Sequence, residues 1–110
     1  MAFRNRTAQG QLAAAPAALL TADPNVTVLV SKVVLFGEEA DTDIQLYVVP
    51  SGGAAGVTNE FYRNPSIGLG EQVNVGLTGV VLYNGQSLQA ESANANRINY
   101  LISYSERTGE

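Results

Sequence analysis

The stretch DIQLYVVP at residues 43–50 decides the fold class, because its apolar and polar side chains alternate with a period of two. This is the pattern of a β-strand that buries one face. Residues 97–105, with the sequence RINYLISYS, alternate in the same way. A register slip by one residue would expose the whole apolar set, so the buried face is well defined. The residues that these two strands are expected to place in the core are Ile44, Leu46, Val48, Ile98 and Ile102.

Further strands are predicted along the rest of the chain. Residues 26–36 are apolar on both faces except for Ser31 and Lys32, which predicts a long central strand, bulged and covered on both sides. Residues 67–77 contain several glycines and predict a bent or bulged strand. Asn84 and Gly85 tolerate positive φ and predict a type I′ hairpin turn. Shorter strands are expected at 17–21, 59–62, 80–83 and 86–90.

The number of short strands and the absence of a sustained helical period predict an all-β protein. We expect an antiparallel β-sandwich, jelly-roll-like in its topology. Residues 1–11 are polar and predict a flexible N-terminal arm that orders only against a partner. The sandwich domain is then expected at residues 12–107, with a short C-terminal tail at 108–110.

The low charge content suggests that part of the surface is covered by another subunit. The chain has 110 residues, enough for one domain, and only 15% of them are charged, whereas roughly 25% is usual. The apolar residues on both faces of 26–36 also imply more buried surface than one small sandwich provides. Both observations predict a homo-oligomer.

Missing residue types exclude several classes of function. The chain has no Cys and no His, which rules out a disulfide, a thiolate nucleophile, a zinc ribbon and histidine-based catalysis within one chain. The net charge of −4 argues against a protein that tracks nucleic-acid phosphates. No basic run, export signal or membrane-spanning segment stands out. We therefore expect no enzyme activity, no cofactor, no resident metal, no nucleic acid and no membrane partner.

Three polar features each allow a chemical interpretation and a plainer one. The acidic loop at 38–43 offers oxygen ligands for Ca²⁺ but lacks the glycine and terminal glutamate of a calcium loop, so it also fits a solvated turn. The glycine-rich loop at 51–56 lacks the ending of a phosphate-binding loop, which favours a hairpin loop. Glu60, Glu71 and Glu91 could supply catalytic carboxylates, but their neighbours share no polar pattern.

An aromatic and basic cluster is the best candidate for an exposed contact. Phe61, Tyr62 and Arg63 are adjacent, and Tyr and Arg are enriched at protein interfaces. Aromatic faces also stack on sugars, so the same residues could form part of a glycan groove, although the chain has no Trp. The alternative is that at least half of the aromatic residues are ordinary strand-packing residues.

Three segments resemble small virion structural proteins of tailed bacteriophages. These are LYVVPSGG at 46–53, GVVLYNGQSLQA at 79–90 and ISYSE at 102–106, and the resemblance covers roughly residues 12–107. The sequence departs from the family pattern at Gln86, where Asp is typical, and at Tyr104, where Gly is typical. Asp23-Pro24-Asn25 also replaces the usual Pro-Ala-Gly turn.

The resemblance implies a capsid decoration, or cement, protein without catalytic residues. Such a protein is a homotrimer made in the bacterial cytoplasm and carried on the virion, where it contacts the major capsid protein. Phe3, Arg4 and Arg6 would then give the arm an apolar anchor and charges suited to an acidic capsid surface. The alternative is a tail, baseplate or fibre module that binds a partner protein or host glycan through Phe61, Tyr62 and their neighbours.

Overall fold

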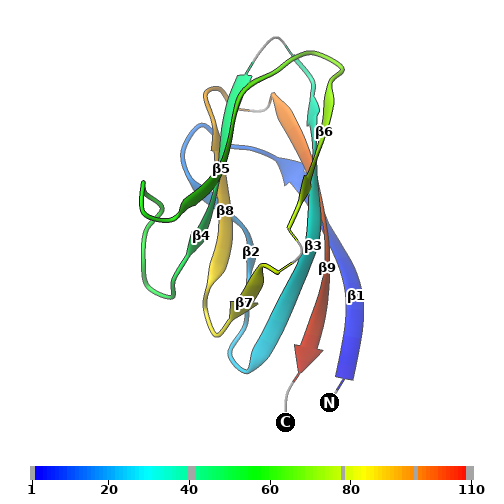
Figure 1. Ribbon diagram of the computed structural model, residues 1–110, viewed down its shortest axis with the longest axis vertical. Helices are drawn as coiled ribbons and strands as arrows, with labels where there is room; N and C mark the ends of the chain where they lie inside the picture. The colour runs from blue at the N-terminus through cyan, green and yellow to red at the C-terminus, as the bar shows by residue number, and fades with distance from the viewer. Residues whose placement is uncertain (1, 40–41, 78, 96, 109–110) are drawn as a thin grey trace.

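The protein is an all-β sandwich of two antiparallel sheets (Figure 1). The computed structural model describes residues 2–39, 42–77, 79–95 and 97–108, and the side chains of Ala2 and Phe3 are not among what it describes. Within these ranges the strands are β1 (Ala2–Gln11), β2 (Ala17–Thr21), β3 (Val26–Gly37), β4 (Thr42–Val49), β5 (Glu60–Ile67), β6 (Gln72–Gly76), β7 (Val81–Tyr83), β8 (Ser87–Ser92) and β9 (Ile98–Thr108). The sequence-based prediction of an all-β sandwich is confirmed.

The chain crosses repeatedly between the two sheets. The first, sheet A, has five strands in the order β1-β9-β3-β6, with β7 also paired to β3. The second, sheet B, has four strands in the order β2-β8-β4-β5. The first and last long strands, β1 and β9, are therefore neighbours in sheet A, and Figure 1 shows them side by side.

The core lies between the inner faces of the two sheets. Ile44 and Leu46 of β4 and Ile98 and Ile102 of β9 are all fully buried there, as their alternation predicts. Val48 is half-buried and packs against the same cluster.

The central strand β3 is long and carries the predicted bulge. Its pairing with β9 shifts between Val30 and Lys32, so Ser31 is the extra residue. Before the bulge the even-numbered Val28 and Val30 face the core, and after it the odd-numbered Val33 and Leu35 do so. One extra residue thus keeps the buried face continuous although the parity of the sequence changes.

The predicted flexible arm is wrong, because residues 2–11 form β1. Ten consecutive residues of β1 pair with β9 without a shift. The polar sequence gave no apolar alternation to indicate a strand, since most of the described side chains of β1 are exposed. Backbone hydrogen bonds to β9, rather than side-chain burial, hold β1 in the sheet. Thr108 belongs to β9, and residues 109–110 of the expected tail lie outside the described residues.

Two other local predictions need correction. The stretch 67–77 is not one bent strand, because a turn at 68–71 separates β5 from β6, and Gly70 adopts a φ of 79°.

Asn84 and Gly85 do have positive φ, 52° and 91°, as expected of a type I′ turn. The strands on either side of that turn do not form a hairpin, however, because β7 pairs with β3 in sheet A and β8 lies in sheet B. The turn therefore carries the chain from one sheet to the other.

Candidate interaction surfaces

The predicted arm residues lie on β1, at the edge of sheet A. Arg4 pairs in register with Glu106, and Arg6 pairs with Tyr104. Both arginines therefore occupy the alternate positions whose side chains point toward the core elsewhere in sheet A. Both are nevertheless exposed. The Arg6 Nη1 atom lies 3.2 Å from Glu106 Oε1 in an ion pair. Phe3 pairs with Arg107 in register, and its side chain lies outside the described residues.

An open depression of about 790 Å³ follows the β1–β9 edge. Its lining comprises Arg4, Asn5, Arg6, Thr7, Ser31, Ser103 and Tyr104. The arginines provide positive charge, and the remaining lining residues are uncharged. This part of the surface therefore suits an acidic or hydrogen-bonding partner.

The outer face of sheet A carries very little charge. Register places β1, β9, β3, β6 and β7 side by side, and among their described outward side chains only Lys32 and Arg107 are charged. Phe36, Val81, Tyr83 and Leu101 on this face are 37%, 46%, 48% and 38% exposed. We call the following residues the apolar outer set: Leu29, Val34, Phe36, Val81, Tyr83 and Leu101. Uncharged side chains thus gather on the outer face of sheet A, and this face is open to solvent in the single copy.

The predicted interface of Phe61, Tyr62 and Arg63 does not form one surface. Tyr62 is half-buried and packs against the core, whereas Arg63 is exposed on the opposite face of β5. Phe61 is the extra residue of a bulge, because Leu46 pairs with Tyr62 and the next residue of β4 pairs with Glu60. Phe61 is 40% exposed. The structure therefore brings no two aromatic rings of this segment to a shared exposed face.

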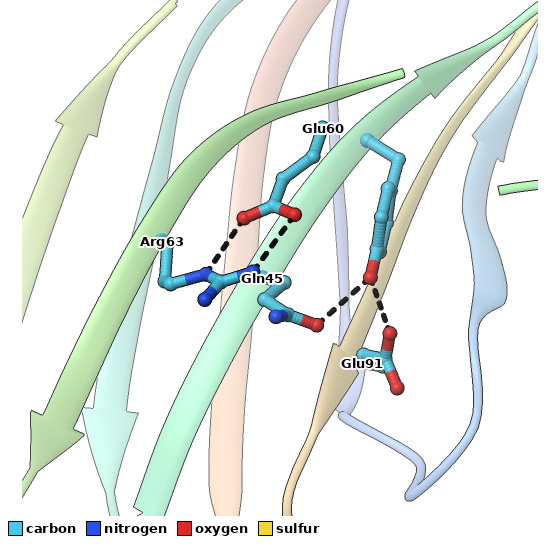
Figure 2. Close-up of polar contacts among 5 residues, drawn as sticks. Gln45, Glu60, Arg63 and Glu91 are labelled. Carbon is cyan, nitrogen blue, oxygen red and sulfur yellow. Dashed lines mark hydrogen bonds and ion pairs between the residues drawn. The ribbon is translucent and has the colours of Figure 1, made fainter. Parts of the chain in front are cut away.

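Arg63 instead belongs to a polar network on the outer face of sheet B (Figure 2). Its Nε and Nη2 atoms donate to the two carboxylate oxygens of Glu60, at 2.8 and 3.1 Å. This bidentate geometry favours the charged form, so the Glu60 carboxylate raises the pKa of Arg63. On the neighbouring strands Tyr47 donates its hydroxyl to Glu91 and also contacts the amide of Gln45.

Gln45 connects the two halves of this network. A hydroxyl has one proton, so when Tyr47 donates it to Glu91 the amide of Gln45 must be the donor to Tyr47. Figure 2 draws Gln45 with its oxygen toward the tyrosine. In the reversed amide orientation Nε2 lies 2.8 Å from Tyr47 Oη and 3.0 Å from Glu91 Oε1, and the amide oxygen accepts from Arg63 Nη2 at 2.9 Å. A donor then faces an acceptor at each of these contacts.

Tyr47 is buried although it faces outward from the sandwich. Only 4% of its surface is exposed. Burial is the main cause that raises the pKa of Tyr47 to about 12, followed by its hydrogen bond to Glu91 and the negative charge of that carboxylate. This network was not predicted from the sequence. Gln45 and Tyr47 were visible as the polar side of a strand, but nothing in the sequence indicated that Glu60 and Glu91 lie on the two strands beside it.

The other polar features show local structural contacts. Glu38 accepts from Asn99 Nδ2 at 2.8 Å, and residues 40–41 of the acidic loop lie outside the described residues. Glu71 accepts from the backbone N–H of Gly68 at 2.8 Å. In the glycine-rich loop, Gly53 N donates to Pro50 O at 2.9 Å. Over the part of the chain that is described, no group of three or more acidic, His or Cys side chains could hold a metal ion.

The class of protein is defined by its fold, a two-sheet antiparallel sandwich with an open, nearly uncharged face on sheet A. No protein-family model and no curated protein matches the chain. A solved structure of infectious bursal disease virus, Gx strain, is similar over 99% of this chain and 38% of that longer chain, with 11% sequence identity and a TM-score of 0.45. No helix among the described residues is long and apolar enough to cross a membrane.

Proposed function

We propose that the protein is a structural component of a tailed-bacteriophage virion, namely a capsid decoration protein that bridges major capsid subunits. The observation that carries this proposal is the outer face of sheet A, where an apolar outer set and uncharged polar side chains lie open to solvent. Exposed apolar patches of this kind mark sites of protein–protein contact. The sequence motifs at 46–53, 79–90 and 102–106 direct the proposal to virions.

The strand order supports a jelly roll. Sheets ordered β1-β9-β3-β6 and β2-β8-β4-β5 place the two ends of the chain together and alternate between the layers. Jelly rolls are double-sheet sandwiches of eight strands, and β7 is then a short addition between β6 and β8. Domains of this type are found in viral capsids and also in lectins and cupins, so the topology is compatible with the proposal without being specific to it.

The protein acts as a homotrimer in this proposal, with the outer face of sheet A as the contact between copies. A trimer seated over a local three-fold position of the shell engages several capsid subunits at once and gains affinity from simultaneous binding. Burial of the apolar outer set would also account for the low charge content of the chain.

β1 is the element proposed to contact the capsid. Arg4 and Arg6 are exposed beside the open depression of β1 and β9, where they can bind carboxylates of the shell. Phe3 lies on the same strand. In this proposal the interaction needs no cofactor, and the chain performs no catalysis.

Copy number tests the proposal. A decoration protein is present in hundreds of copies on each particle, whereas a tail, baseplate or fibre module is present in a handful. We expect quantification of this chain in purified virions to give about one copy or more per three major capsid subunits. A much lower ratio, or loss of the chain when tails are removed, would overturn the decoration role in favour of the tail module.

A further inference from the structure

β1 differs from the other strands at the edges of the two sheets. Like β2, β5, β6 and β7, it is paired on one side, in its case with β9. Its ten residues pair with β9 without a bulge and include no proline. Long edges without interruptions offer a row of unpaired N–H and C=O groups to another strand.

The other edges are short or interrupted. β6 has five residues and β7 has three. β2 has five residues and a register shift at 18–20. β5 has eight residues, but it contains Pro65 and two register shifts. Short length, proline, bulges and inward-pointing charges are devices that protect sheet edges from pairing with another chain. β1 is the long edge that lacks the first three, and it carries Arg4 and Arg6 at inward-facing positions.

The sequence of β1 is complementary to itself when two copies run antiparallel. Its charged residues, Arg4 and Arg6, lie in the first half, and the small residues Ala8 and Gly10 lie in the second half. A two-fold axis at Thr7 places Arg6 opposite Ala8 and Arg4 opposite Gly10 of the other copy. Residues that face each other across antiparallel strands share a sheet face, so a small side chain lies directly opposite each arginine, and the Arg6 of the other copy lies at the position diagonal to Arg6.

The register with its axis at Arg6 is less favourable. Moving the axis to Arg6 would place that arginine directly opposite its own copy, which is a repulsive pair. β1 contains no acidic residue that could compensate for it. The axis at Thr7 instead pairs two threonines, a cross-strand combination that can hydrogen-bond.

We propose that two copies of this chain pair through β1, antiparallel and with Thr7 on the two-fold axis. Sheet A then continues from one protomer to the next in the order β3-β9-β1-β1′-β9′-β3′. The contact is isologous and uses a sheet edge. It is therefore distinct from the proposed three-fold contact on the outer face, and it joins copies irrespective of that contact.

Single cysteines test the axis, because the natural chain has none. Residues directly opposite in an antiparallel pair have Cα atoms about 4.5–5.5 Å apart. That separation lies within the roughly 4.4–6.8 Å that a disulfide spans. We expect purified Thr7→Cys, oxidised mildly at micromolar concentration, to be recovered mainly as a disulfide-linked dimer on a non-reducing gel. The matched control is Ser66→Cys, which is also exposed on an edge strand, β5.

A pair of variants tests the register. Asn5 and Gln9 are exposed on β1, and the axis at Thr7 places each opposite the other. A mixture of Asn5→Cys and Gln9→Cys is expected to form the mixed dimer several-fold faster than either variant cross-links alone. Equal cross-linking of Thr7→Cys and Ser66→Cys, or of the mixture and the single variants, would overturn the inference. Circular dichroism of each variant confirms that it is folded, and the experiment needs no virion, so its outcome is separate from that of the proposed function.

Discussion

Tyr47 of β4 donates its hydroxyl proton to the carboxylate of Glu91 on the neighbouring strand β8. The two residues are diagonal neighbours, because Tyr47 pairs in register with Gln89 and Glu91 pairs with Gln45. The bond lies on the outer face of sheet B, yet Tyr47 is almost completely buried. A buried hydroxyl that donates to a charged acceptor is costly to lose, so this contact ties β4 to β8 more firmly than strand pairing alone.

Removing the hydroxyl should destabilise the protein. In Tyr47→Phe, Glu91 loses the phenolic donor, while the amide of Gln45 remains 3.0 Å from Glu91 Oε1 in the reversed orientation. We expect the free energy of unfolding to fall by about 1.5–3 kcal/mol, the range for hydrogen bonds to charged groups. Urea denaturation at neutral pH measures the change. The exposed Tyr83 provides the matched control, and Tyr83→Phe should change stability by less than about 0.5 kcal/mol.

Stability should fall at alkaline pH because of the same tyrosine. Its pKa is raised from 10.0 to about 12 in the folded protein. Between these two values the unfolded chain has released the phenolic proton and the folded chain still holds it, so raising the pH favours unfolding. The stabilisation is complete below pH 10 and is lost as the pH rises toward about 12. Denaturation midpoints of the natural chain and Tyr47→Phe should converge over this interval, and a constant difference would contradict the assignment.

Alternation and turn chemistry were enough to predict the sandwich and its central elements. The fully buried Ile44 and Ile102 follow directly from a period of two. β1 could not be predicted in this way, because a strand held by backbone pairing and exposing most of its side chains has no apolar period. The Asn84-Gly85 turn shows a second limit, since φ preference specifies a turn but not which sheet the next strand joins. Side chains from β4, β5 and β8 meet at Gln45 only through pairing between distant segments.

Charge on the outer face of sheet A should disrupt the proposed oligomer. Leu101 lies near the middle of this face, paired with Gln9 of β1 on one side and Val34 of β3 on the other. Leu101→Glu should weaken association at least about tenfold, because an unpaired charge would be buried in the contact. Light scattering coupled to size-exclusion chromatography should show a smaller mass. Val57→Glu is the control, since Val57 is 88% exposed in the β4–β5 loop, and an equal effect there would contradict the assignment of the face.

A β-carbon at Gly37 should be poorly tolerated. Gly37 ends β3, and its carbonyl accepts from Gly70 N at 2.8 Å. A methyl group there would overlap the backbone carbonyl of Gly68, which cannot turn away as a side chain could. We expect Gly37→Ala to lower the free energy of unfolding by about 1–3 kcal/mol. Gly76→Ala is the matched control because it has open space around the added carbon, and it should be neutral or slightly stabilising.

The arginines of β1 should govern attachment to the capsid while contributing little to folding. Deleting residues 1–11 would remove a strand of the sheet and leave β9 with a free edge, so substitution is the sharper experiment. The Arg6–Glu106 ion pair is largely exposed on the arginine side, with 46% of the Arg6 side chain accessible, and such pairs contribute less than about 1 kcal/mol. Arg4→Ala combined with Arg6→Ala should therefore unfold near the natural midpoint, yet bind virion shells stripped of this protein about tenfold more weakly or worse. The matched control replaces both arginines with lysine, which keeps the charge. If the lysine pair retains attachment and the alanine pair loses it, positive charge on β1 binds the shell. Undiminished attachment of the alanine pair would instead remove β1 from the mechanism.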